Sequence, residues 1–137
     1  MGRPAARMGD SIVNNGDIHI VLIPTPGGPV PTPGPFPFNG KISLNTSINV
    51  RINGRPAAVV GSMAQNLPPH VPFGGAFQIP PTNLGRVLTG SASVRINGHG
   101  AARAGDYCET CHDIPPAGPQ GPRPTIVVRD TSNVFIG

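Results

Sequence analysis

One short run of the chain gathers residues that bind metal ions. Cys108, Cys111 and His112 lie within the heptapeptide Tyr-Cys-Glu-Thr-Cys-His-Asp at positions 107–113. A Cys-x-x-Cys pair on a tight turn presents two thiolates within reach of one tetrahedral zinc ion, which then needs two further ligands. A structural disulfide is the alternative use of the two cysteines, although disulfides are rare in the reducing cytoplasm.

The same run has the form Cys-x-x-Cys-His, which is the attachment signature of c-type haem. Covalent haem loading usually requires export, and the N-terminus has no charged segment followed by an apolar one. Aromatic residues, which would cover a porphyrin, make up only 4% of the chain. We therefore expect zinc, and a haem-containing electron-transfer protein is kept as an alternative.

A nine-residue phrase occurs three times and must position these residues, because repeats at intervals fix the architecture of a chain. Its copies occupy residues 2–10, 54–62 and 98–106. The runs 47–54 and 92–98, in which Val or Ile alternates with polar residues, lead into the second and third copies. This alternation is typical of a half-buried strand, and the Asn-Gly pair that ends each run is a strong hairpin signal. Each repeat is therefore expected to be a β-hairpin.

The chain ends on the same strand pattern, and the phrase that should follow it is found at the N-terminus. When Asn53, Asn97 and Gly137 are aligned, the position after Gly137 corresponds to Gly2. We therefore expect the closing segment 125–137 to pair with the first phrase. This pairing predicts a closed, pseudo-threefold β structure in which the two termini form the seam.

The threefold arrangement predicts where the remaining metal ligands come from. His19 and His70 follow the first and second phrases by nine and eight residues, and the Cys-rich run follows the third by two to six. Corresponding positions in a threefold structure converge near its axis. Five candidates compete for the four positions around one structural zinc ion: His19, His70, Cys108, Cys111 and His112. Cys111 and the adjacent His112 reach one ion together only if the backbone turns sharply, so the choice between Cys108 and His112 stays open.

The repeats resemble the PAAR-repeat family, above all in Pro4-Ala5-Ala6-Arg7 followed by Gly9-Asp10. The resemblance covers nearly the whole chain, since it includes three copies of the phrase and the Ile-Asn-Gly hairpins before two of them. It implies a small three-faced β cone whose broad base caps a trimeric spike and whose point is ordered by one zinc ion. Such cones form the tips of contractile injection machines: type VI secretion spikes, phage tail spikes and extracellular injection particles.

The resemblance predicts one all-β domain over residues 1–137, a pseudo-threefold cone or prism of three hairpin repeats closed by its own termini. The expected partner is a trimeric β-helical spike, which would bind one tip per three spike chains. The target membrane would be contacted only transiently, and the long segments 24–38 and 72–85 could contact effector cargo. The protein would be made in the cytoplasm and then join an injection particle that expels it on contraction.

Composition predicts a thin apolar core with stiff connections. Hydrophobic residues make up 37% of the 137 residues and Trp is absent, so ring closure, a metal or a partner must add stability. The 19 prolines concentrate in the inter-repeat segments 24–37, 68–81 and 115–124. Proline fixes φ and lowers the entropy lost on ordering, so these segments are expected to be extended loops, with flexible linkers as the alternative. No window has the periodicity of a helix.

Several classes of function are not expected. No apolar stretch approaches the ~18 residues of a transmembrane helix, and there is no Ser-His-Asp set or paired-carboxylate spacing of an enzyme. A zinc ion with four protein ligands has no open position for a substrate. The formal charge of +4 would permit a zinc-containing nucleic-acid-binding module, which is the other alternative. The arginines do not cluster among aromatic residues, so we expect no nucleic-acid partner.

Overall fold

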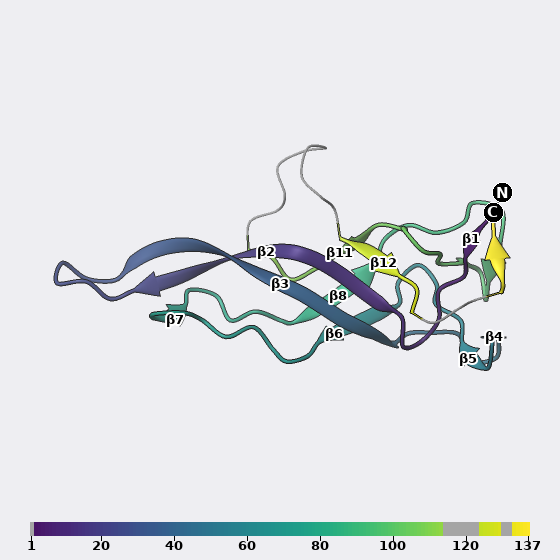
Figure 1. Cartoon of the computed structure of the whole chain (residues 1–137), viewed down its shortest axis with the longest axis horizontal. Coiled ribbons are helices and arrows are strands. Elements are labelled where there is room, and N and C mark those ends of the chain that lie inside the picture. Colours follow the sequence, from purple (N-terminus) through teal and green to yellow (C-terminus); the bar gives the residue numbers. More distant parts are fainter. Residues whose placement is uncertain (1, 114–123, 130–132) are drawn as a thin grey trace.

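The chain folds into a cone in the computed structural model, which describes residues 2–113, 124–129 and 133–137. Both termini and the short hairpins lie at the broad end, and a long hairpin runs to the narrow end (Figure 1). The described residues form strands and connecting segments without any helix, so the all-β prediction is confirmed. Accordingly, no helix long and apolar enough to cross a membrane occurs in this part of the chain.

Three two-stranded units form the broad end, one from each repeat. They pair β1 (Arg3–Pro4) with β13 (Phe135–Ile136), β4 (Arg51–Ile52) with β5 (Arg55–Pro56), and β9 (Arg95–Ile96) with β10 (His99–Gly100). Asn53 and Asn97 have φ angles of 51° and 54°, and the glycine after each also has a positive φ. These are the values that a two-residue hairpin turn requires. In the third unit Arg3 pairs with Ile136, which confirms that the termini form the seam.

The three phrases meet in a closed ring of backbone hydrogen bonds. The N–H of Ala6 donates to the carbonyl of Ala102 at 2.9 Å, that of Ala102 to Ala58 at 3.0 Å, and that of Ala58 to Ala6 at 3.0 Å. A second set closes the ring in the opposite direction, because Met8 donates to the second phrase, Val60 to the third and Ala104 to the first. The pseudo-threefold closure therefore includes all three repeats on equal terms.

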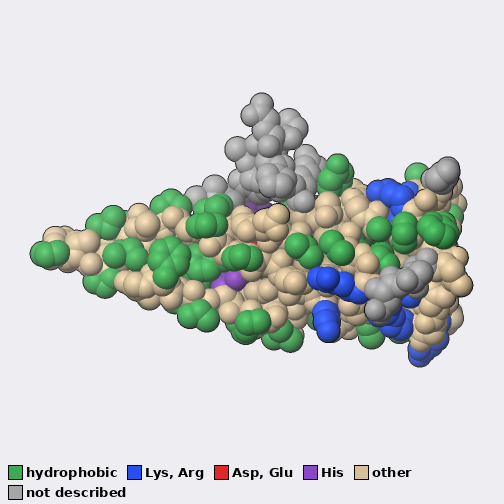
Figure 2. All heavy atoms as spheres, viewed as in Figure 1, with side chains coloured by type: hydrophobic (Ala, Val, Ile, Leu, Met, Phe, Trp, Pro, Cys, Tyr) green, Lys and Arg blue, Asp and Glu red, His purple; other side chains and the backbone are tan. Residues whose placement is uncertain are grey.

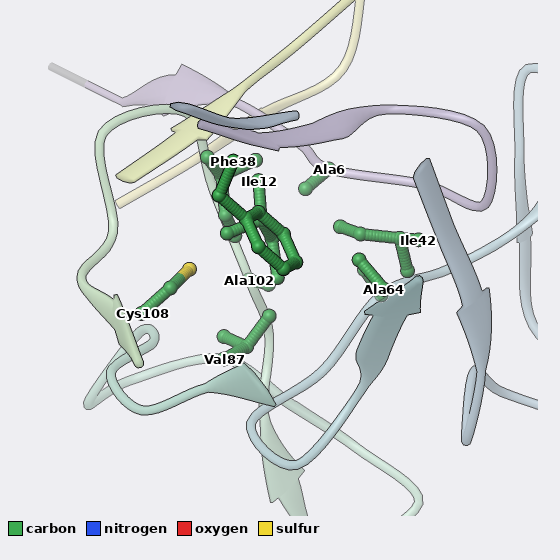
Figure 3. Close-up of a cluster of buried hydrophobic side chains, with 10 residues drawn as sticks. Ala6, Ile12, Phe38, Ile42, Ala64, Val87, Ala102 and Cys108 are labelled. Carbon is green, nitrogen blue, oxygen red and sulfur yellow. The ribbon is translucent and has the colours of Figure 1, made fainter. Parts of the chain in front are cut away.

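Burial explains why each phrase contains two adjacent alanines. The first alanine of each pair (Ala5, Ala57, Ala101) packs into an apolar cluster with Ile52, Ile96 and Ile136 of the broad end. The second alanine faces the opposite way, into the central core around Phe38, Ile12 and Ile42 (Figure 3). All six are at most 1% exposed, so a side chain longer than a methyl group would have to displace its neighbours.

A single sheet forms the body and the narrow end of the cone. Its strands are β2 (Ser11–Ile23), β3 (Val30–Leu44), β6 (Met63–Asn66), β7 (Ala76–Phe77), β8 (Leu84–Val87), β11 (Cys108–Glu109) and β12 (Thr125–Val127). The order is β11-β8-β6-β3-β2-β12, and β7 adds to the free side of β2 near the narrow end. The pairing of β2 with β3 continues from Ser11 to Ile23 and makes the long hairpin that reaches the narrow end (Figure 1).

The proline-rich segments differ from their prediction as loops. Residues 30–37 belong to β3 and are paired with β2, although four of them are proline. Pairing is possible because the prolines alternate with residues that keep their N–H and direct it toward β2. The segment 68–81 is mostly irregular and contains only β7, and most of 115–124 lies outside the described residues. The closing segment is divided between β12, which pairs with β2, and β13.

Candidate metal centre

A bulge in β2 brings two potential ligands to the inward face of the sheet. The register of β2 against β3 shifts between Asn14 and Asp17. Before the shift, Ile12 and Asn14 are buried; after it, Asp17 and His19 are buried. A strand alternates its faces with a period of two, so the extra residue changes which positions point inward. The bulge thereby aims a carboxylate and an imidazole into the cone.

Asp17, His19, His70 and Cys111 each offer one ligand atom, and these four atoms lie within 4.8 Å of one another. The Cys111 Sγ lies 3.4 Å from Asp17 Oδ2 and 3.5 Å from His19 Nε2, and His70 Nε2 lies 3.4 Å from Asp17 Oδ2. Bonds of 2.0–2.3 Å in a tetrahedron around zinc would separate ligand atoms by about 3.3–3.7 Å. The spacing of the donors therefore fits a small divalent cation.

The carboxylate of Asp17 is held by two neutral donors. Its Oδ1 accepts a hydrogen bond of 2.7 Å from the Asn14 side-chain amide and another from the Thr110 hydroxyl. Asp17 is completely buried, so these bonds and the neighbouring His70 are what offset the loss of water around the charge. Because Oδ1 is taken up by these donors, Oδ2 is the oxygen directed at the ligand group.

Both imidazoles are oriented by neighbouring groups. Asp113 Oδ1 lies 3.1 Å from Nδ1 of His19, and the other oxygen of Asp113 accepts the backbone N–H of Ile20 at 3.0 Å. A carboxylate at the outer nitrogen of a histidine is the usual support of a metal ligand. For His70, the Asn66 side-chain amide nitrogen lies 3.3 Å from its Nδ1, and the backbone N–H of His70 donates to Asn83 Oδ1 at 2.9 Å, which fixes this irregular segment against the body.

Burial governs the protonation of the two partly buried donors. It raises the pKa of the Cys111 thiol to about 12, and the negative charge of Asp17 adds to the rise. Burial also lowers the pKa of His70, against the opposing effect of Asp17. In the absence of a cation, Cys111 is therefore a neutral thiol near pH 7. A bound cation would supply the positive charge that a thiolate and a carboxylate need at this depth.

Aromatic rings enclose the donors. Phe36 and Phe77 contact His19 edge-on, each with ring centroids 5.7 Å from it, and Phe36 also lies 5.6 Å from His70. Such rings keep bulk water away from the group of donors. Dry surroundings strengthen the attraction between a cation and its ligands.

The structure brings three of the five sequence candidates together, namely His19, His70 and Cys111. Cys108 is not in this group: it lies in strand β11 opposite Val87, and its side chain points into the apolar core (Figure 3). His112 is also outside the group, and its buried Nδ1 has no hydrogen-bond partner in the described part of the chain. The two thiols are both free, and they face different surroundings.

Asp17 completes the group, although it is not among the five candidates predicted from the sequence. A signal was present, because Asp17 and His19 are separated by one residue and would share a face of any strand. The rule for Cys-x-x-Cys assumed a tight turn, in which both sulfurs approach one ion. Cys108 and Glu109 instead form part of a strand, so the Cys108 side chain lies in the core cluster while Cys111 belongs to the group of donors.

The core position of Cys108 predicts a thiol that does not react in the native protein. Burial raises its pKa to about 12, and only the thiolate attacks disulfide reagents. In the Cys111→Ser variant we expect the remaining thiol to react at least about a hundredfold more slowly in the folded than in the urea-unfolded protein. The rate should stay low at pH 8 to 9, well below this pKa. A fast reaction there would contradict the core position.

No protein-family model, curated protein or solved structure matches this chain.

Proposed function

We propose that this protein is the non-enzymatic tip of a spike in a contractile injection machine, where it sharpens a trimeric β-helical spike for membrane puncture. One observation supports this most directly: a single chain presents three equivalent units at a flat end around the ring of Ala6, Ala58 and Ala102. A monomer with this internal symmetry matches a threefold partner without breaking the partner's symmetry. The tapered shape and the resemblance to PAAR repeats agree with the proposal (Figure 1).

The broad end is the side that would face the spike. Each of its three hairpins would meet one spike chain. Ile48 is 97% exposed and lies between Ser47 and Asn49, whose side chains both hydrogen-bond to Asn97 of the β9–β10 turn; Phe135 of β13 is also exposed. Arg51 and Arg95 occupy the same position in their hairpins, and both are exposed. Lys and Arg side chains gather in the broad half of the molecule (Figure 2). Apolar contacts surrounded by cations suit a partner with acidic groups.

We further propose that the four donors of the metal centre hold one zinc ion. Two imidazoles, a thiolate and a carboxylate form a donor set that zinc accepts, and four protein ligands leave no open position for catalysis. The zinc would link β2, the segment before β7 and the segment after β11. Its role would be to stiffen the cone where it starts to narrow. Whether the machine is a secretion system, a phage or an extracellular particle is left open, as is effector cargo.

The stoichiometry of the complex tests this function. We expect one tip to bind three spike chains when the full chain is mixed with purified trimeric β-helical spike protein from the same organism. Light scattering after size exclusion would give the mass of the complex. The Ile48→Asp variant should bind at least about tenfold more weakly, because it places a charge in an apolar contact. Its matched control is Val71→Asp at the narrow end, which should bind normally. One tip per spike chain, or a loss of binding with Val71→Asp alone, would contradict the proposal.

A further inference from the structure

The narrow end of the cone has no charge. It consists of residues 20–34 and 71–82, and these segments contain no Lys, Arg, Asp, Glu or His. His19 lies opposite Gly34, and residue 71 follows His70 directly, so the uncharged region starts at the metal centre. In Figure 2 apolar side chains cover much of the narrow half, while Lys and Arg side chains lie in the broad half. Among the described residues, the charges are thus absent from the narrow end and present from the metal centre to the broad end.

Apolar side chains at the narrow end point outward. Val71 is 74% exposed, Ile79 is 57% exposed, and Val30 and Phe73 are each about half exposed. In a protein surrounded only by water, exposed apolar groups of this size and density mark a surface that contacts something else. Because no charge accompanies them, the complementary surface has to be apolar as well.

The backbone of the narrow end has also lost hydrogen-bond donors. Ile20 uses its carbonyl to accept the N–H of Gln78, so the even-numbered residues of this part of β2 face β7 and the odd-numbered ones face β3. His19 lies opposite Gly34 and Val21 opposite Thr32, which makes these the hydrogen-bonded pairs. The alternate positions of β3 therefore point to its outer edge.

Those alternate positions are prolines, all of them exposed: Pro31 and Pro33 in the narrow end, and Pro35 and Pro37 beside the metal centre. An exposed strand edge normally presents a row of N–H groups, which water satisfies but hydrocarbon does not. Here the outer edge has carbonyl groups and no N–H at four successive outward positions. The same feature prevents another strand from pairing fully with this edge. The alternating prolines thus make this edge a poor partner for another strand, and they lower the free-energy cost of moving the edge from water into lipid.

The uncharged region is long enough to reach well past the middle of a bilayer. A strand rises about 3.3 Å per residue, so the chain from His19 to Thr25, where the turn begins, rises about 20 Å, against about 30 Å for the hydrocarbon core. Entry up to the metal centre would therefore place the turn beyond the middle of the hydrocarbon. The first charged residues would then remain at the headgroups.

We infer that the narrow end is a lipid-binding surface that enters the hydrocarbon of a bilayer by itself, in addition to being pushed by a spike. The inference rests on the proposed function for the direction of movement, and it names the partner of the narrow end. The partner is the acyl-chain region of a lipid bilayer, not an anionic headgroup.

Single-tryptophan reporters test this in the metal-loaded full chain, which has no Trp of its own. The Val71→Trp variant reports on the narrow end, and the Ile48→Trp variant is the matched control at the broad end. Both native residues are among the most exposed in the chain, so neither change should disturb folding. With phosphatidylcholine vesicles, we expect a blue shift and quenching by brominated acyl chains for Val71→Trp only. Equal effects for both variants, or none, would overturn the inference.

A charge at the narrow end should weaken the partition into vesicles. Val30→Asp is expected to lower the partition coefficient roughly tenfold or more, since a carboxylate is costly in hydrocarbon, whereas high salt should leave the native protein bound.

Binding that requires anionic vesicles and disappears at high salt would assign the contact to the basic broad half and overturn the inference. So would a blue shift of Val71→Trp that depends on protein concentration without lipid, because a second copy would then cover the narrow end. Spike stoichiometry, measured separately, distinguishes these failures from a failure of the proposed function.

Discussion

Removal of the proposed zinc ion is expected to lower the melting temperature of the protein by about 10 °C or more. The core is thin, and the four donors come from three segments that are far apart in the sequence. Without the cation, the buried Asp17 keeps only hydrogen-bonded neighbours, and the His70 side chain is held to β2 by its contact with Asp17 alone and no longer by a shared ion. The measurement is calorimetry of the protein with and without a chelator, together with elemental analysis. An unchanged melting temperature after complete removal of the metal would contradict a structural role.

Variants at the metal centre separate ligands from neighbours. Cys111→Ala and His70→Ala should each abolish stoichiometric zinc. Asp17→Asn keeps the size of the side chain but removes the charge of a direct ligand, so it should lower zinc affinity by more than the roughly 10–100-fold that loss of an outer-shell partner costs. Cys108→Ala is the matched control and should retain one zinc per chain. An absorption spectrum of the native protein tests the haem alternative, since iron with a Soret band would overturn the zinc proposal. Normal zinc in His70→Ala, or loss of zinc in Cys108→Ala, would show that the ligand group is different.

The threefold framework could be predicted from the sequence because its causes are local and repeated. The Asn-Gly pairs fix two hairpin turns through positive φ angles at both residues. The alternation of Val and Ile with polar residues sets the strand faces, and the Ala-Ala pairs mark the places where three chain segments meet. The offset between the first phrase and the last strand predicted the pairing of β1 with β13. Each of these signals needs only a few neighbouring residues.

The metal centre depended on features that are not local. Asp17 points inward because β2 has a bulge. Gly16 lies within this bulge and is the one local signal for it, but a glycine in a strand does not by itself fix the register on either side. Cys108 was assigned by its spacing from Cys111, but the pairing of β11 with β8 turns its side chain toward the core. The proline content of residues 30–37 predicts a loop. Only the direction of the hydrogen bonds between β2 and β3 shows that these prolines lie on the unpaired edge of a strand. Tertiary pairing decided all three.

A buried ion pair in the first phrase gives the second large expected effect: Asp10→Ala should lower the free energy of unfolding by about 3–5 kcal/mol. Asp10 is completely buried, and Arg7 is 2% exposed. Asp10 Oδ2 accepts the backbone N–H of Arg7 at 2.8 Å and lies 3.5 Å from its Nε, while Oδ1 accepts the N–H of Arg129 at 2.7 Å. Alanine would leave the Arg7 guanidinium buried without its carboxylate. Urea unfolding of both proteins measures the difference.

The second phrase supplies the matched control, because it builds the same turn without charge. Val59 and Ser62 correspond to Arg7 and Asp10, and the Val59 N–H donates to Ser62 Oγ at 2.9 Å. The double variant Arg7→Val, Asp10→Ser should therefore cost less than about 2 kcal/mol, since it removes both charges and keeps the hydrogen bond of the turn. If the double variant loses as much stability as Asp10→Ala, the turn or the contact with Arg129 is what Asp10 supports, and the cost does not come from an unpaired buried cation. If the double variant recovers most of the stability that Asp10→Ala loses, the same turn backbone is stable with an ion pair in the first repeat and without one in the second.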